Sequence, residues 1–127
     1  MKVVPCTPNI GATVNGVDLS NEISDSEADF FYDALLKHLV LFFHDQKLTP
    51  DQLSFFAHKF GPLEGSHHTY ESLKGFDHVT VLNMGPENPP DSAEWHADLT
   101  FNHDAAFATV LQGVEIPSVG GDNLWAN

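Results

Sequence analysis

Residues 24–43 read SDSEADFFYDALLKHLVLFF and carry the clearest structural pattern in the chain. Ser24 and Glu27 have the spacing of an N-terminal capping box, and apolar residues then recur at helical intervals, at Ala28, Phe31, Leu35 and Leu39. This pattern predicts a helix over about 25–38. The five apolar residues 39–43 that follow predict a strand buried on both faces.

Two further patterns flank this stretch. Upstream, the valine pair 3–4 and the segment 11–19, which combines β-forming residues with an Asn-Gly turn signal, predict an opening pair of short strands. Downstream, residues 49–52 form a second capping box with proline at the first helical position. Apolar residues follow at helical spacing and Gly61 lies after the last turn, so a second helix is predicted from Pro50.

Beyond Gly61 the pattern changes to loops and short strands. A polar loop is expected to about Asp77, then an apolar strand over 78–83, and then a segment over 84–92 that is rich in Gly-Pro and Asn-Pro turn signals. Three more strands are predicted, at about 95–101, 106–112 and 122–126. No internal repeat is visible, and a chain of this length supports one core, so residues 1–127 are expected to form a single domain.

The composition narrows the class of protein. The chain has 127 residues, of which 42% are hydrophobic, an ordinary value for a globular domain. Its formal net charge is −13 and its five basic residues are all scattered lysines, so binding to nucleic acid is not expected. Cys6 is the only cysteine, which excludes an internal disulfide and a cysteine-rich zinc site. The longest apolar run has five residues, too few for a membrane span or a signal peptide, so a cytoplasmic protein is expected.

A histidine and a carboxylate lie two residues apart, at His96 and Asp98. On the predicted strand, the period of two places both side chains on one face, with their Cα atoms roughly 6.5 Å apart. Imidazole and carboxylate at this spacing suit a first-row metal, and one distant histidine would complete a facial triad of the kind that oxygenases use. The alternative interpretation is an ordinary pair of polar residues, which is common in a chain with eight histidines.

The surroundings of this pair resemble a known family. Residues 95–101, WHADLTF, followed by 117–127, PSVGGDNLWAN, resemble the taurine catabolism dioxygenase (TauD/TfdA) family of Fe(II)- and 2-oxoglutarate-dependent dioxygenases. Further marks occur in the family's order, at 11–12, 16–19, 41–43, 45–46, 60–61 and 88–90. The resemblance implies an α+β fold, in which a double-stranded β-helix (jelly roll, clavaminate synthase-like) carries helices on its outside and iron between its sheets.

The same resemblance implies roles for particular residues. His96 and Asp98 match the first two iron ligands of the family's motif. Asn123 occupies a position that is usually threonine and helps to bind 2-oxoglutarate; an asparagine amide can also donate to a carboxylate, or the residue simply ends a glycine-rich turn. His67 and Tyr70 match the spacing of a histidine and a tyrosine that contact the substrate in sulfonate-binding members, with a histidine-rich surface loop as the alternative.

Two features of the family's site are missing from the sequence. The second histidine ligand and the arginine that pairs with the far carboxylate of 2-oxoglutarate come from the C-terminal half of the jelly roll, and the chain contains no arginine. We therefore expect a dioxygenase domain truncated before that half.

The predicted function is hydroxylation of a small, anionic organic substrate such as a sulfonate, with release of succinate and CO₂. Two alternatives stay open: a non-catalytic binding module that keeps the fold, and an incomplete half-barrel that is stable only as an oligomer or beside a second chain. The expected partners are a small-molecule substrate and further copies of the chain in a homo-oligomer, and neither nucleic acid nor a membrane is expected.

Overall fold

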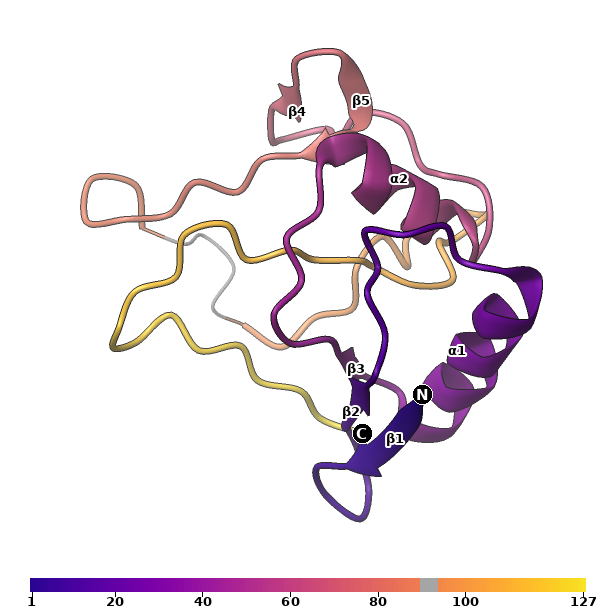
Figure 1. Cartoon of the computed structure of the whole chain (residues 1–127). Coiled ribbons are helices and arrows are strands. Elements are labelled where there is room, and N and C mark those ends of the chain that lie inside the picture. The colour runs from indigo at the N-terminus through magenta and orange to yellow at the C-terminus, as the bar shows by residue number, and fades with distance from the viewer. Residues whose placement is uncertain (90–93) are drawn as a thin grey trace.

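A computed structural model describes residues 1–89 and 94–127 (Figure 1). Its elements follow one another as strand β1 (Lys2–Pro5), strand β2 (Ala12–Asn15), helix α1 (Asp25–His38), strand β3 (Leu41–Phe42), helix α2 (Pro50–His58), strand β4 (Ser72–Leu73) and strand β5 (Phe76–Thr80). In the part of the chain that the structure describes, all helices and strands thus lie before residue 81.

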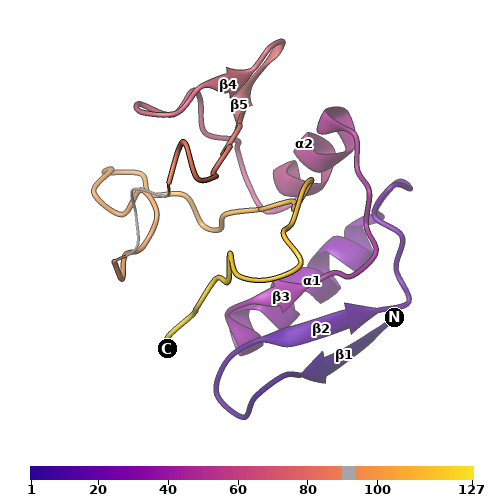
Figure 2. The same cartoon turned by 90° about the vertical axis from the view of Figure 1, so that its left-hand side faces the viewer.

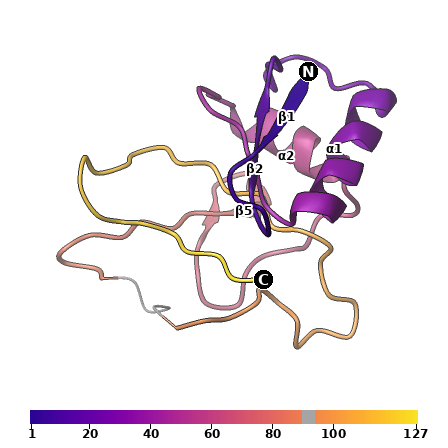
Figure 3. The ribbon, with the colours of Figure 1, turned by 90° about the horizontal axis from the view of Figure 1, so that it is seen from below.

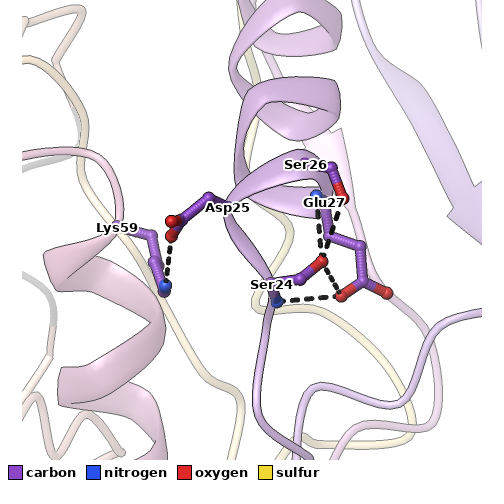
Figure 4. A network of polar contacts seen from close by, with 5 residues as sticks. All are labelled: Ser24, Asp25, Ser26, Glu27 and Lys59. Carbon is purple, nitrogen blue, oxygen red and sulfur yellow. Dashed lines mark hydrogen bonds and ion pairs between the residues drawn. The ribbon is translucent and has the colours of Figure 1, made fainter.

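Helix α1 begins at the predicted capping box. The Ser24 hydroxyl accepts a hydrogen bond from the amide of Glu27 (3.3 Å), and the Glu27 carboxylate accepts one from the amide of Ser24 (2.9 Å) (Figure 4). The Ser24 hydroxyl also lies 2.7 Å from this carboxylate, and its hydrogen bond, together with that of the amide, holds the pKa of Glu27 below its usual range. Lys59, just past α2, forms an ion pair with Asp25 at 3.1 Å. The helix predicted over 25–38 is confirmed.

The two predicted opening strands are present and pair antiparallel, with Lys2 opposite Asn15 at one end of the register. Strand β2 also pairs in parallel with β3, which gives the sheet order β1-β2-β3. The prediction of a strand over 39–43 buried on both faces is wrong, because β3 is a half-buried edge strand of two residues. Leu39 instead ends α1 in the left-handed conformation (φ 66°), so the extended backbone starts later than the apolar run does.

Helix α2 also begins as predicted. The Thr49 hydroxyl accepts from the amide of Gln52 (3.3 Å), the Gln52 side chain accepts from the amide of Thr49 (2.8 Å), and proline stands at the first helical position. Nε2 of Gln52 further donates to the carbonyl of Ser20 at 2.8 Å, which ties the start of α2 to the loop before α1. The helix ends at His58, and the amide of Gly61 closes a last turn on the His58 carbonyl at 3.2 Å.

The core lies between the two helices and the sheet. Phe31 of α1 is fully buried and meets Phe43 and Phe56 edge-on, with ring centroids 5.5 and 5.9 Å apart. Phe43 and Phe56 also meet each other, at 5.5 Å. The buried cluster is completed by Val14, Leu19 and Ile23. Figure 2 shows α1 lying along the β1-β2-β3 sheet, with the β4-β5 hairpin beyond α2, so the core belongs to the N-terminal half of the chain.

Residues 94–127 run as loops and turns (Figure 3). The strands predicted at 95–101, 106–112 and 122–126 are therefore wrong, because a strand needs backbone hydrogen bonds from a neighbour and no strand among the described residues pairs with these segments. The strand predicted over 78–83 is present in part as β5 (Phe76–Thr80), which pairs with β4 in the segment expected to be a loop. The described residues form a three-stranded sheet and a separate hairpin, and not a closed jelly roll.

The segment 107–112 nevertheless packs on the N-terminal core. The ring of Phe107 stacks on Tyr32 of α1, with centroids 4.9 Å apart and planes inclined by 18°. Val110 packs against the buried cluster, and the side-chain amide of Gln112 donates to the carbonyl of Leu48 at 3.1 Å. These three contacts come from three different side chains of one short segment, so they hold that segment against the first half of the chain.

The last residues return to the first strands. The ring of Trp125 meets Phe42 of β3 edge-on at 5.4 Å, and Nδ2 of Asn127 donates to the carbonyl of Asn9, in the β1-β2 turn, at 3.3 Å. Figure 1 shows this end of the chain beside the β1-β2-β3 sheet.

The turn-rich segment predicted over 84–92 is described as far as Pro89. Gly85 and Asn88 pair with each other through two backbone hydrogen bonds of 2.8 and 3.0 Å, as a tight turn requires. The remainder of this segment, including Pro90 of the family resemblance, lies outside the described residues. Among the residues that the structure does describe, no helix combines the length and the apolar content that crossing a membrane requires.

Candidate metal centre

The side chains of His96 and Asp98 face each other. Nε2 of His96 and Oδ1 of Asp98 are 3.4 Å apart, and the two side chains are 55% and 51% exposed. The backbone turns over 98–101, with Leu99 in the left-handed conformation (φ 52°) and the Asn102 amide bonded to the Leu99 carbonyl at 3.0 Å. The pair therefore lies where an irregular segment enters a turn, whereas the sequence predicted the alternation of a strand.

A backbone contact defines the tautomer of His96. Its Nδ1 lies 2.8 Å from the carbonyl oxygen of Glu94. A carbonyl oxygen only accepts, so Nδ1 carries the hydrogen and donates. In the neutral imidazole, Nε2 then holds the lone pair with which histidine binds a metal, and this is the nitrogen next to Asp98.

A cation fits between these two atoms. A lone pair on Nε2 and a carboxylate oxygen repel each other at 3.4 Å, and a positive charge on or between them turns this repulsion into attraction. That charge is either a proton on Nε2, which makes an ion pair, or a metal ion shared by both atoms. Two ligands at about 2.1 Å from one ion, at a right angle, lie roughly 3 Å apart, so only a small adjustment is needed. Imidazole nitrogen with carboxylate oxygen is a donor set that suits Fe(II).

The pair offers a metal two protein ligands. Within residues 1–89 and 94–127, no third histidine, cysteine, aspartate or glutamate joins it to make a larger group. The open positions around such an ion would therefore be filled by water, by a cosubstrate or by another polypeptide. The assignment of His96 and Asp98 as iron ligands stays a prediction.

One residue at this site was not predicted. The hydroxyl of Thr109 donates to Oδ2 of Asp98 at 2.9 Å. The two residues are 11 positions apart and belong to segments that the sequence predicted to be separate strands, so no local pattern joins them. The contact of His96 with the Glu94 carbonyl was not predicted either, because every residue has a backbone carbonyl and the residue type therefore does not indicate the contact.

His67 and Tyr70, the predicted substrate pair, also lie together. Their rings are 4.9 Å apart and inclined by 34°. Nδ1 of His67 accepts hydrogen bonds from the amides of Thr69 (3.1 Å) and Tyr70 (3.3 Å). Nδ1 therefore carries no hydrogen, and in the neutral ring the hydrogen is on Nε2. The loop thus holds an imidazole N–H donor beside the ring of Tyr70.

Asn123, the residue predicted to bind 2-oxoglutarate, is exposed in the segment that follows the glycine pair 120–121. Both glycines have positive φ, of 80° and 72°, so the chain turns sharply just before it. Among the described residues, His96 is hydrogen-bonded to the carbonyl of Glu94, and Asp98 to the hydroxyl of Thr109. Asn123 is thus not joined directly to the pair, and its role stays a prediction.

Comparison with known proteins decides the family. The model of the taurine catabolism dioxygenase TauD, TfdA family matches residues 2–127. The chain belongs to this family. TauD/TfdA proteins are dioxygenases that use Fe(II) and 2-oxoglutarate, as the resemblance of the 95–101 motif implied.

Individual TauD/TfdA relatives match most of the chain. An alkylsulfatase from Acinetobacter baylyi is 37% identical over 123 residues, which cover 95% of this chain and 38% of the relative. An α-ketoglutarate-dependent sulfate ester dioxygenase from Pseudomonas putida is 32% identical over 130 residues, covering 100% of this chain and 42% of the relative. The crystal structure of a taurine dioxygenase from Burkholderia xenovorans matches with 34% identity and a TM-score of 0.57, over 60% of this chain and 27% of that one.

These relatives are much longer than the matched region. The chain spans about two-fifths of the length of the curated relatives it matches. The structural match shows that 60% of this chain shares the fold of part of a taurine dioxygenase.

Proposed function

We propose that this chain forms the iron-binding part of an Fe(II)- and 2-oxoglutarate-dependent dioxygenase that hydroxylates a small, anionic organic substrate such as a sulfonate or a sulfate ester. The observation that carries the proposal is the His96–Asp98 pair, in which a metal-binding nitrogen and a carboxylate oxygen lie 3.4 Å apart. In this proposal, the complete dioxygenase domain folds as a jelly roll with α1 and α2 on its outside. A cytoplasmic location is also proposed, and the free thiol of Cys6 agrees with it.

Iron and 2-oxoglutarate, when bound, supply the oxidation of a substrate C–H bond by dioxygen, with conversion of 2-oxoglutarate to succinate and CO₂. His96 and Asp98 would hold the metal, with the Glu94 carbonyl orienting the imidazole. Asn123 would donate to a carboxylate oxygen of 2-oxoglutarate. The chain has no arginine for the far carboxylate, so that contact would come from outside these 127 residues.

The proposed substrate class rests on His67 and Tyr70. Their rings are 4.9 Å apart, and the tautomer of His67 gives the loop an Nε2–H donor beside the Tyr70 ring. Such a donor suits an anionic head group, which the net charge of −13 would otherwise repel. Relatives named for sulfate esters and, in Saccharomyces cerevisiae, for sulfonates act on substrates of this charge.

Anaerobic titration of the chain with Fe(II), followed by 2-oxoglutarate, tests the proposal. The expected result is one Fe(II) site per chain and the weak visible charge-transfer band of the iron chelate, both lost in His96→Ala. His103→Ala is the matched control, because His103 is 98% exposed and pairs only with its neighbour Asp104 within the described contacts. Fe(II) binding that is absent, or equal in both variants, would overturn the proposal.

A second candidate function is a binding or oligomerisation module. It is favoured by the exposed apolar side chains of the second half, among which Val119 is 88% and Val114 83% exposed. Where exposed apolar side chains form a contiguous patch, they mark a surface that another polypeptide covers. An oligomerisation module requires a homo-oligomer in light scattering and a melting temperature that does not change when Fe(II) is added. A binding module requires ligand binding without release of succinate.

A further inference from the structure

We propose that Thr109 is a positioning residue of the metal site, whose hydroxyl occupies Oδ2 of Asp98 and thereby leaves Oδ1 for the metal shared with His96. This inference rests on the proposed function, because it requires His96 and Asp98 to bind a metal. Nothing in the local sequence around Asp98 indicates it, since the contact joins residues 11 positions apart.

The two oxygens of Asp98 have different neighbours. Oδ2 accepts the hydrogen of the Thr109 hydroxyl at 2.9 Å, whereas Oδ1 lies 3.4 Å from Nε2 of His96. An aspartate without such a contact can turn about its side-chain bonds and offer either oxygen, or both, to a metal. The hydroxyl removes that freedom, because turning the carboxylate would break its hydrogen bond. Asp98 is thus prepared to bind through one oxygen, on the side of His96.

The position of Thr109 is itself determined by the N-terminal core. Phe107, two residues before it, stacks on Tyr32 of α1 at 4.9 Å, and Val110, the next residue, packs against the buried cluster. Gln112 donates to the Leu48 carbonyl at 3.1 Å. Thr109 is exposed, but the segment that carries it is attached on both sides. Its hydroxyl therefore holds a half-exposed turn in place from an anchored part of the chain.

The hydrogen bond from Thr109 to Asp98 can be tested by substitution. His96 is oriented by the carbonyl of Glu94, a backbone group that substitution does not remove. Thr109→Val removes one hydroxyl and keeps the branched shape of the side chain. Thr109→Ser keeps the hydroxyl and removes a methyl group. The pair separates the hydrogen bond from the packing of the side chain.

The experiment is titration of the full chain with Co(II), followed by its visible absorption, with circular dichroism of every variant to check α1 and α2. Co(II) binds nitrogen and oxygen sites at least as tightly as Fe(II) and reports its coordination in the spectrum. We expect Thr109→Val to raise the Kd for Co(II) about tenfold and to shift the visible absorption band of bound Co(II). Loss of a residue that orients a metal ligand usually weakens metal binding about 10–100-fold, and the low end applies here because Asp98 is half exposed. Thr109→Ser is expected to restore both the Kd and the band.

Two further variants keep the outcomes distinct. Thr100→Val is the matched control, because Thr100 lies in the same turn and its hydroxyl contacts the carbonyl of Ala97 and neither proposed ligand. His96→Ala tests the metal site itself. Loss of Co(II) binding in His96→Ala with unchanged binding in Thr109→Val overturns the role of Thr109 and leaves the proposed function standing. Equal weakening in Thr109→Val and Thr100→Val also overturns it, whereas unchanged binding in His96→Ala refutes the proposed function.

Discussion

Replacing Phe31 by alanine is expected to destabilise the fold more than any substitution in the second half of the chain. Phe31 is 0% exposed and its ring lies edge-on to Phe30, Phe43 and Phe56, at 5.9, 5.5 and 5.9 Å. Phenylalanine-to-alanine changes in cores cost about 3–5 kcal/mol. Three edge-to-face pairs, each worth about 0.5–1.5 kcal/mol beyond the buried area, place this site at the upper end of that range. Because domains are stable by only about 5–15 kcal/mol, this loss removes a large part of the free energy of unfolding.

Urea unfolding followed by far-ultraviolet circular dichroism measures the effect, since both helices lie in the first half of the chain. Phe31→Leu, which keeps most of the volume, is expected to cost less than about 1.5 kcal/mol and remains measurable if the alanine variant does not fold. Phe101→Ala is the control, because Phe101 is 76% exposed and its removal is expected to change stability by less than about 0.5 kcal/mol. A loss below about 2 kcal/mol for Phe31→Ala would refute the central placement of this ring.

Four other outcomes are expected. Ser24→Ala removes the N-cap of α1 and is expected to cost about 1 kcal/mol in urea unfolding. Because folding lowers the pKa of Glu27, its carboxylate stabilises the folded state above the ordinary glutamate pKa, and this stabilisation is lost as the pH falls through the folded pKa. Glu27→Gln should therefore weaken the dependence of stability on acid, measured as the urea midpoint from pH 6 to pH 3. Two hydrogen bonds of Gln46, of 2.8 and 3.3 Å, join the segment after β3 to Leu19 and Val17 in the loop before α1, so Gln46→Leu should cost about 1–3 kcal/mol, and a neutral effect would contradict this bridge. A double-mutant cycle of Tyr32→Ala and Phe107→Ala should give a coupling of about 0.5–1.5 kcal/mol, and a coupling of zero would refute the packing of residues 107–112 on α1.

The candidate site shows how far residue patterns reach. The motif at 95–101 indicated the family and suggested His96 and Asp98 as metal ligands. In the structure, Nε2 of His96 and Oδ1 of Asp98 lie 3.4 Å apart. The reason given for their approach was wrong, since a turn with Leu99 at positive φ takes the place of a strand. The contact of Thr109 with Asp98 was not predicted from the sequence, because a threonine hydroxyl can bond to many different groups and only the fold decides which of them lies next to it. His67 and Tyr70 lie together because a short loop keeps a spacing of three within contact distance, and their role stays a prediction.

The sequence by itself determined both helices of this TauD/TfdA protein, because their signals are local. Each capping box joins residues three apart, at Ser24 and Glu27 and at Thr49 and Gln52, and needs no distant partner. Only the tertiary structure decided which apolar runs become strands, because a strand exists only where another strand supplies its hydrogen bonds. It left two residues of the run 39–43 as β3 and none of 95–101 as a strand. It also decided that Thr109 reaches Asp98, since a contact across 11 residues depends on how the intervening chain packs on the core.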